Sequence, residues 1–397
     1  MTLIPARDTG PTLRDLLEKA SAGQRYNLAF PGATDLTHQI LAELMTTQLL
    51  NNVGSPYDGG HGHNHTKGLE VEVVDMVGDM MRAPATRWGY VTGGSTECTE
   101  HALLNARMQF PDLVVYSSAD AHYSVAKITR KLMLPFVTVA STPTGQMDLT
   151  DLEGELARRR DRPAMIVATA GTTVTEAVDD VAGITAICRR LALTRRRIHV
   201  DAALSGPPLA LLPETVRPAF DFTAGATSIG ISGHKSLGTL MPCGVIVYAE
   251  APYAAAIARV SYTGTRDVTI TGSRSGHTPL LLWSVLAGLG SDLHTNRFDA
   301  ARQLAEQARA RLADIGVDAQ RNPHAFTVYF PPPPPELLKK WTVTGDERYS
   351  HIIVMPGTEA EQLDELVTDW QLLMRPVPAP RRKLARLLGT AATKGGP

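Results

Sequence analysis

A lysine between two apolar runs is the residue of this sequence whose chemistry is most readily inferred. Lys235 ends the segment Ser232-Gly233-His234-Lys235, which follows one run of strand length and precedes another. The glycine and serine beside it allow the backbone to come close to a bound molecule. Burial lowers the pKa of a lysine and makes its nitrogen a nucleophile toward carbonyl carbon. Taken alone, the tripeptide Gly-His-Lys also fits an ordinary surface loop.

A glycine pair opens a predicted helix further upstream. Gly93-Gly94-Ser95-Thr96 follows a predicted strand. Free backbone N–H groups at such a helix start, together with the helix dipole, favour an anion such as phosphate. A capped helix without any ligand is the alternative, with Ser95 or Thr96 as the cap. The residues alone leave both interpretations open.

An aspartate and a histidine follow two other predicted strands. Asp201 closes the strand Ile198-His199-Val200, and a carboxylate is costly to bury there without a cationic partner. An aspartate that caps a turn is the alternative. His122 begins a predicted helix, and as an isolated residue it fits a histidine at a helix start with no catalytic part.

The composition excludes several classes of protein. The chain has 397 residues with 39 basic and 40 acidic side chains, so no overall field attracts nucleic acid or an anionic membrane. The cysteines, Cys98, Cys188 and Cys243, lack CxxC spacing and support neither a disulfide framework nor a zinc site. No apolar run has signal-peptide length at the N-terminus or reaches the roughly 20 residues of a membrane helix. We expect a cytoplasmic protein without a nucleic-acid or membrane partner.

Short apolar strands alternate with amphipathic helices over most of the chain. This alternation predicts an α/β fold with a mostly parallel sheet covered on both faces, whose ligand lies at the carboxyl ends of the strands. Helical spacing is also present at 12–20 and 35–50, and two separate helices are expected at 278–289 and 297–315. The expected parts are an N-terminal arm and helix at 1–50, a large domain at 51–290, a small C-terminal α+β domain at 291–375 and a mobile tail at 376–397.

The segment around Lys235 resembles the pyridoxal-phosphate lysine motif of the small group II amino-acid decarboxylases. In that family Ser-Gly-His-Lys is followed by Met-Pro-Cys-Gly and an apolar strand, and here the second group spans Met241 to Gly244. The resemblance extends from about Tyr26 to about Trp370 and is closest to bacterial histidine decarboxylases and plant serine decarboxylases. It implies the fold type I of pyridoxal-phosphate-dependent transferases, with a seven-stranded sheet, and a homodimer with shared active sites.

The resemblance also implies roles for individual residues. Lys235 would hold pyridoxal 5'-phosphate as a Schiff base, Asp201 would pair with the pyridine nitrogen, and His122 would stack on the ring. Tyr262 resembles the tyrosine of a mobile loop that protonates the product carbon, with an aromatic packing contact as the alternative. The other implied cofactor-binding residues are Gly94, Ser95, Thr96, Thr172, Ala203, Ser232, His234 and Ser273.

Three segments depart from the family pattern, one of them by Ser275 in place of the usual asparagine of Gly-Ser-Arg-Asn-Gly-His. Where the family reads Gly-Thr-Glu-Gly-Asn, this chain keeps only the Thr-Glu pair, at Thr96 and Glu97, which puts the contact of the usual asparagine in question.

The third departure is the stretch HGHNH at 61–65, whose alternating histidines could converge on a metal ion. It aligns instead with the family segment near the substrate pocket, and His65 falls on a histidine of the plant serine decarboxylases. We therefore expect Tyr57, His61, His63 and His65 to shape substrate choice, expect no metal, and question histidine as the substrate.

Together these features predict a carboxy-lyase that converts an L-amino acid into the corresponding amine through the Lys235 Schiff base. Decarboxylation coupled to oxidation or transamination, with a carbonyl product, is a rival because the same carbanion can react elsewhere. A catalytically silent relative that serves as a binding subunit is the rival from another class. The retained Lys235, Asp201 and His122 argue against it.

Overall fold

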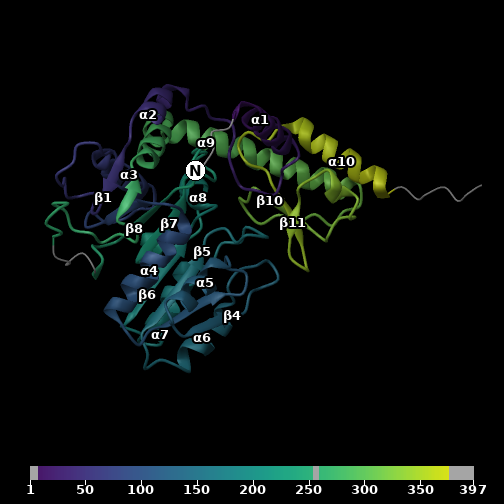
Figure 1. Ribbon diagram of the computed structural model, residues 1–397. Helices are drawn as coiled ribbons and strands as arrows, with labels where there is room; N and C mark the ends of the chain where they lie inside the picture. The colour runs from purple at the N-terminus through teal and green to yellow at the C-terminus, as the bar shows by residue number, and fades with distance from the viewer. Residues whose placement is uncertain (1–7, 254–258, 375–397) are drawn as a thin grey trace, which may run out of the picture.

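A seven-stranded sheet forms the centre of the molecule (Figure 1). The structure is a computed structural model that describes residues 8–253 and 259–374. In order across the sheet, the strands are β2 (Trp88–Thr92), β8 (Gly244–Tyr248), β7 (Ser228–Ser232), β6 (Arg196–Asp201), β5 (Ala164–Thr169), β3 (Val114–Ser118) and β4 (Phe136–Val139). Strand β8 runs antiparallel to both neighbours, while the other pairs are parallel. The predicted fold class, a mostly parallel seven-stranded α/β sheet, is confirmed.

Helices cover both faces of this sheet because successive strand residues point to opposite sides. Ile166 of β5 belongs to one apolar cluster and Val167 to another, and both are fully buried. The first face is covered by α3 (Lys67–Met80), α6 (Leu149–Ala157), α7 (Val181–Arg190), α8 (Gly206–Ala210) and part of α9 (His277–Asp314). The second is covered by α4 (Ser95–Gln109) and α5 (Ser124–Lys131).

A smaller three-stranded sheet forms the C-terminal unit, which we define as residues 291–374. It consists of the end of α9, the strands β10 (Thr327–Phe330), β11 (Thr344–Gly345) and β12 (Ser350–Ile353), and α10 (Ala360–Met374), with a short 3-10 turn, η4, at Leu337–Lys339. Phe330, Trp341 and Trp370 are buried in its core. The two helices expected at 278–289 and 297–315 form one element, α9, which breaks at Gly290, where φ is 68°. Figure 1 shows α9 leading from the sheet to this unit.

The N-terminal segment lies against the C-terminal unit. Helix α1 (Gly10–Arg25) is longer than expected and has Pro11 in its first turn, where the missing N–H of proline costs no helical hydrogen bond. The helix predicted over 35–50 is wrong in part, because only η1 (Gln39–Leu41) and α2 (Ala42–Thr47) form there. The backbone N–H groups of Ala33 and Thr34, just before it, are bonded to Lys235 and Pro356 instead. The domain boundaries stay predictions, and the tail at 376–397 lies outside the described residues.

A buried ion pair fixes the two-stranded sheet of β1 (Asn51–Val53) and β9 (Ser273–Ser275) to the central sheet. Glu70 of α3 binds Arg274, accepts a hydrogen bond from Asn52 Nδ2 at 2.7 Å and accepts another from the Val91 N–H at 2.9 Å. Both charged side chains are at least nine-tenths buried.

Removing Glu70 should therefore strand a buried guanidinium. We expect Glu70→Ala to lower the free energy of unfolding by about 3–5 kcal/mol, measured by urea denaturation of the purified protein. Glu18→Ala, on the exposed helix α1, is the control and should change it by less than about 0.5 kcal/mol. Equal stability of the two variants would contradict this account of the pair.

Candidate active site

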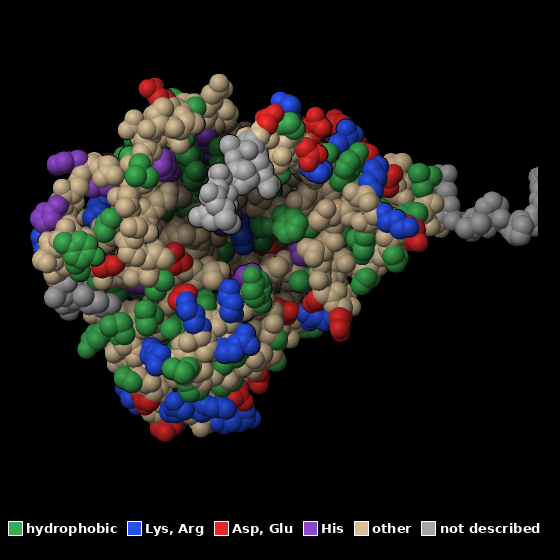
Figure 2. Space-filling view, in the orientation of Figure 1, with side chains coloured by type: hydrophobic (Ala, Val, Ile, Leu, Met, Phe, Trp, Pro, Cys, Tyr) green, Lys and Arg blue, Asp and Glu red, His purple; other side chains and the backbone are tan. Residues whose placement is uncertain are grey.

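The carboxyl ends of the parallel strands open into a cavity of about 770 Å³, which we call the Lys235 cavity. It lies between the central sheet and the C-terminal unit, and Figure 2 shows this face of the molecule hollowed where the two parts meet. The loops after β2, β3, β5, β6 and β7 all reach it, since parallel strands end at one edge of a sheet. The predicted site residues on its wall are Gly94, Ser95, Thr96, His122, Asp201, Ala203, Ser232, His234 and Lys235.

Lys235 follows β7, and its amine is unpaired. Its backbone carbonyl accepts hydrogen bonds from Ala33 and Gly238, whereas Nζ bonds to no residue in the described parts of the chain. Burial lowers the pKa of Lys235, and the negative charges of Asp201 and Glu176 oppose this effect. The amine is thus both accessible from the cavity and less basic than a surface lysine.

Asp201 ends the neighbouring strand β6, and one of its oxygens is engaged. Oδ1 accepts hydrogen bonds from Ser95 Oγ at 2.9 Å and from the Ala203 N–H at 3.2 Å. Oδ2 accepts none from the described residues, although the side chain is 6 % exposed. A second oxygen on the cavity wall is therefore available to a cationic hydrogen-bond donor.

His122 lies in the loop between β3 and α5. Its Nδ1 is 2.7 Å from Ser124 Oγ, and its ring centroid is 4.3 Å from that of Tyr123. Burial lowers the pKa of His122, the charge of Asp201 raises it, and the charge of Lys235 lowers it again. The imidazole is accordingly neutral near pH 7.

The start of α4 offers backbone donors to the cavity. The N–H groups of Ser95 and Thr96 bond to no described residue, as expected for the first turn of a helix. Gly94 before them has φ 149°, which an L side chain rarely adopts. The Glu97 carboxylate is held beside them by the Gly93 N–H at 2.7 Å and the Tyr90 hydroxyl at 3.0 Å. These N–H groups can bind an anion.

Two of the predicted residues support the wall through their neighbours. His234 Nδ1 lies 3.0 and 3.1 Å from the backbone O and N of Cys243, so it joins β7 to the segment that leads into β8. Thr172 is buried, and its hydroxyl accepts a hydrogen bond from the Ala177 N–H at 2.9 Å rather than facing the cavity. Its neighbours Gly171 and Thr173 line the cavity instead.

The remaining predicted residues lie outside the Lys235 cavity. Tyr262 is 84 % exposed, and it lines a separate pocket of about 140 Å³ with His61 and His65. His61 holds this loop, because its Nε2 lies 3.3 Å from the Ser261 carbonyl oxygen. Figure 2 shows histidine side chains at one margin of the molecule, and His63 is exposed too.

Tyr57 and Ser273 are also separate from the Lys235 cavity. The Tyr57 hydroxyl accepts a hydrogen bond from the Gly89 N–H at 3.2 Å, and burial raises the pKa of Tyr57 to about 12. Ser273 is exposed on β9, where it pairs with Val53. Within one chain, the predicted site residues therefore form two separate clusters, one around Lys235 and one around Tyr262.

Sequence reasoning missed part of the cavity wall. Phe30 and its neighbours in the N-terminal segment line it, as do Thr344, His351 and Ile353 of the C-terminal unit. His351 is buried, its Nδ1 has no partner among the described residues, and burial lowers the pKa of His351 to about 4. These residues reach the cavity only through long-range packing, so no local motif marks them.

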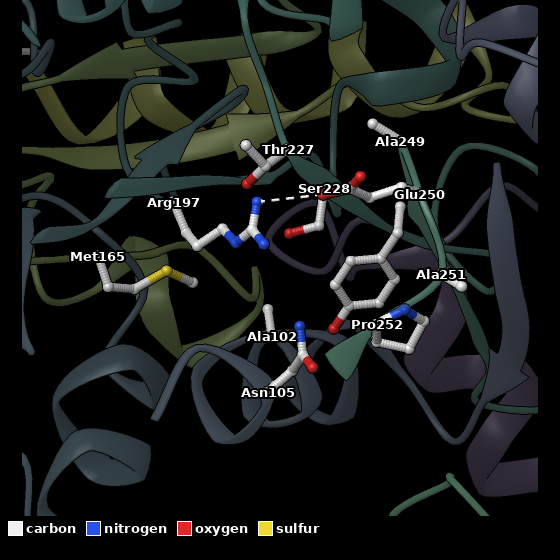
Figure 3. Close-up of a pocket in the computed structure, with 11 residues that line it drawn as sticks. Ala102, Asn105, Met165, Arg197, Thr227, Ser228, Ala249, Glu250, Ala251 and Pro252 are labelled. Atoms are coloured by element: carbon white, nitrogen blue, oxygen red, sulfur yellow. Dashed lines mark hydrogen bonds and ion pairs between the residues drawn. The ribbon is translucent and has the colours of Figure 1, made fainter. Parts of the chain in front are cut away.

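A second cavity lies at the opposite edge of the sheet. Figure 3 shows Arg197 and Thr227 on its wall, with Arg197 3.5 Å from the Glu250 carboxylate. Its volume of about 50 Å³ has room for a few water molecules only. Within residues 8–253 and 259–374, no cluster of three or more His, Cys, Asp or Glu is arranged for a metal, and no helix is long and apolar enough to cross a bilayer.

Comparisons with known proteins identify the family of the chain. The model of the pyridoxal-dependent decarboxylase conserved domain matches residues 29–318. The histidine decarboxylase of Mesorhizobium japonicum is 38% identical over 341 residues, which cover 86% of this chain and 91% of that protein. The histidine decarboxylase of Morganella morganii is 33% identical over 353 residues, covering 87% and 92%. The resemblance to bacterial histidine decarboxylases is confirmed.

Solved structures support the same fold. The L-methionine decarboxylase of Streptomyces sp. 590 superposes with a TM-score of 0.82 at 25% identity, covering 92% of this chain and 95% of that one. The glutamate decarboxylase of Lactobacillus brevis superposes with a TM-score of 0.79 at 19% identity, covering 94% of each, and shows the fold alone. The chain belongs to the pyridoxal-dependent decarboxylase family and is a carboxy-lyase that uses pyridoxal 5'-phosphate to decarboxylate an amino acid.

Proposed function

We propose that the protein converts an L-amino acid into the corresponding amine in the Lys235 cavity, with the cofactor attached to Lys235. The observation that carries this proposal is that the Asp201 carboxylate, at the end of β6, and Lys235, in the turn after the adjacent strand β7, line one cavity. The charge of Asp201 acts on Lys235, which supports their closeness.

The groups left unpaired in this cavity fit pyridoxal 5'-phosphate. Nζ of Lys235 suits the aldehyde, the free Oδ2 of Asp201 suits the ring nitrogen, and the N–H groups of Ser95 and Thr96 suit the phosphate. Thr169 Oγ1 is buried on the wall and has no partner in the described residues. Lys235, Asp201 and the start of α4 thus each match one polar feature of the cofactor.

The chain's own residues would perform the following tasks. When bound, the cofactor supplies an electron sink for the pair of electrons left when carbon dioxide departs. Asp201, whose position is fixed by the hydrogen bond from Ser95, would place a carboxylate at the ring nitrogen. His122, fixed by Ser124, packs as a neutral ring against the cavity. The C-terminal unit adds Thr344, His351 and Ile353 to the cavity wall, where they would limit the access of water to the substrate carboxylate.

A product assay tests the proposal. The purified protein with added pyridoxal 5'-phosphate is incubated with single L-amino acids, including histidine, serine, methionine and acidic and branched residues. Carbon dioxide release and the organic product are measured together. We expect one amino acid to yield carbon dioxide and its amine in equal amounts. A carbonyl product would favour the oxidative rival, and no release with any amino acid would contradict the proposal.

We also propose that the protein forms a homodimer in which each chain completes the active site of the other. Tyr262 and His61 lie outside the Lys235 cavity of their own chain, which leaves them free for a second copy. Exposed apolar side chains gather in the N-terminal segment, on which a partner could pack, namely Leu13, Leu16, Leu17, Ile40 and Leu49.

The three cysteines are free and buried, which supports a reducing compartment such as the cytoplasm.

Complementation between two variants tests this sharing. Tyr262→Phe removes the proposed proton donor, and Lys235→Ala removes the proposed attachment point, so each variant alone should form little amine. Co-expressed with different tags, the mixed dimer should contain one intact site and recover about a quarter of wild-type amine formation in the unsorted mixture. A mixed dimer with no more activity than the single variants would show that the sites are not shared.

A further inference from the structure

Glu176 is a buried carboxylate close to the Lys235 cavity with no part in the proposed chemistry. It lies in the loop between β5 and α7 and is 2 % exposed. Its φ of 53° is left-handed, which is uncommon for a residue with a side chain. Such a conformation persists only where surrounding contacts hold it.

Four hydrogen bonds converge on this carboxylate from two other segments. Oε1 accepts one from Ser205 Oγ at 2.8 Å. Oε2 accepts three, from the Phe326 N–H at 2.9 Å, the Thr327 N–H at 2.8 Å and Thr327 Oγ1 at 2.6 Å. Burial raises the pKa of Glu176, and these hydrogen bonds oppose that effect because each of them favours the ionised carboxylate.

The segments that meet at Glu176 form the wall of the Lys235 cavity. Ser205 belongs to the loop that begins at Asp201 and carries Ala203 on the wall. Gly171, also on the wall, packs so tightly that an added Cβ would lie 2.3 Å from Ser205 Oγ. Thr327 begins β10 of the C-terminal unit. Glu176 therefore joins that unit to two wall segments.

The charge of Glu176 acts on Lys235. Burial lowers the pKa of Lys235, and the charges of Asp201 and then Glu176 raise it. Arg302 is the other cation on which Glu176 acts, but it already binds Asp299 at 2.7 Å. Lys235 has no such ion pair in the described parts of the chain, so it depends more on these two carboxylates.

We propose that Glu176 is a positioning residue that fixes two segments of the cavity wall against the C-terminal unit and places a second negative charge, besides Asp201, near Lys235. This inference rests on the proposed function of Lys235. The titratable groups on which the charge of Lys235 acts, or whose charge acts on it, are Asp201, Glu176, His122 and His234. Of these groups, Glu176 also binds Thr327 of the C-terminal unit, so its charge reaches the lysine nitrogen from a position that depends on how this unit is docked.

Glu176→Gln separates the charge from the packing. The amide oxygen can take the place of Oε2 and keep the bonds from Phe326 and Thr327, while the amide nitrogen can donate to Ser205 Oγ. In the holoenzyme, the pH at which the visible band of the bound cofactor changes reports protonation at the Lys235 nitrogen. Loss of a nearby negative charge disfavours the cationic form, so we expect the midpoint to fall by roughly one pH unit.

Two further variants make the test decisive. Glu176→Gly removes the charge together with all four hydrogen bonds, while its backbone suits the left-handed conformation, so it should lower the midpoint and also weaken the docking of the C-terminal unit. Thr327→Val removes one donor, keeps the charge and should leave the midpoint within about 0.3 pH unit of the wild type. An unchanged midpoint in both Glu176 variants, or an equal fall in Thr327→Val, would overturn the inference. A wild-type protein without any visible band would instead contradict the proposed function of Lys235.

Discussion

Lys235→Ala should abolish both the visible absorbance of the bound cofactor and amine formation. Nζ of Lys235 is the unpaired amine of the cavity, and its lowered pKa favours the nucleophilic neutral form. Without it, the aldehyde of the cofactor has no covalent anchor between the cofactor-binding loops. We expect kcat to fall by roughly 10⁴-fold or more, as on removal of other covalent nucleophiles. Absorbance spectra and an amine assay at saturating cofactor check this result.

Another lysine of the same cavity provides the control. Lys131 lines the rim, is 63% exposed and pairs with Glu100 at 2.5 Å. Lys131→Ala should keep the visible band, because this amine lies at the exposed rim and already pairs with the Glu100 carboxylate. If the band disappears in this variant and persists in Lys235→Ala, the attachment point is misassigned.

Asp201→Asn should produce the second largest loss. The amide oxygen can still accept hydrogen bonds from Ser95 and Ala203, so the side chain keeps its place. It loses the negative charge that stabilises a protonated ring nitrogen, and with it the electron sink of the cofactor. We expect kcat to fall by roughly 10³-fold, with a smaller effect on cofactor binding.

Ser95→Ala is the matched control for this charge. It removes the 2.9 Å hydrogen bond to Asp201 and keeps the carboxyl group itself. A single neutral hydrogen bond contributes about 1 kcal/mol, so kcat should fall by less than about tenfold. If Asp201→Asn and Ser95→Ala lose similar activity, the charge of Asp201 is not what matters.

The centre of the site could be predicted because its signals are local. β-Branched runs of strand length end at Asp201 and Ser232, and the parallel sheet they form must bring those ends to one edge. The glycine pair before Ser95 likewise marks a strand that turns into a helix at the same edge. The parallel strands, the start of the helix at Ser95 and the edge of the sheet that they share could therefore be predicted from residues only a few positions apart.

The rest of the wall depends on contacts between distant segments. Phe30 and His351 reach the cavity through the packing of the N-terminal segment on the C-terminal unit, which no local spacing encodes. The helix expected from residue 35 does not form at its first residues, where Asp35 instead pairs with Arg297, 262 positions away in the sequence. Glu176 gave no signal in sequence, since its partners Ser205 and Thr327 lie 29 and 151 positions away.

The site of cofactor attachment is the claim on which the account depends. Borohydride reduction of the holoenzyme converts a carbonyl–amine link into a stable bond, and peptide mass spectrometry then locates the modified lysine. We predict a pyridoxyl-phosphate adduct on the peptide that contains Lys235, and none on that peptide in Lys235→Ala. An adduct confined to another lysine, or no adduct in an active preparation, would contradict the assignment.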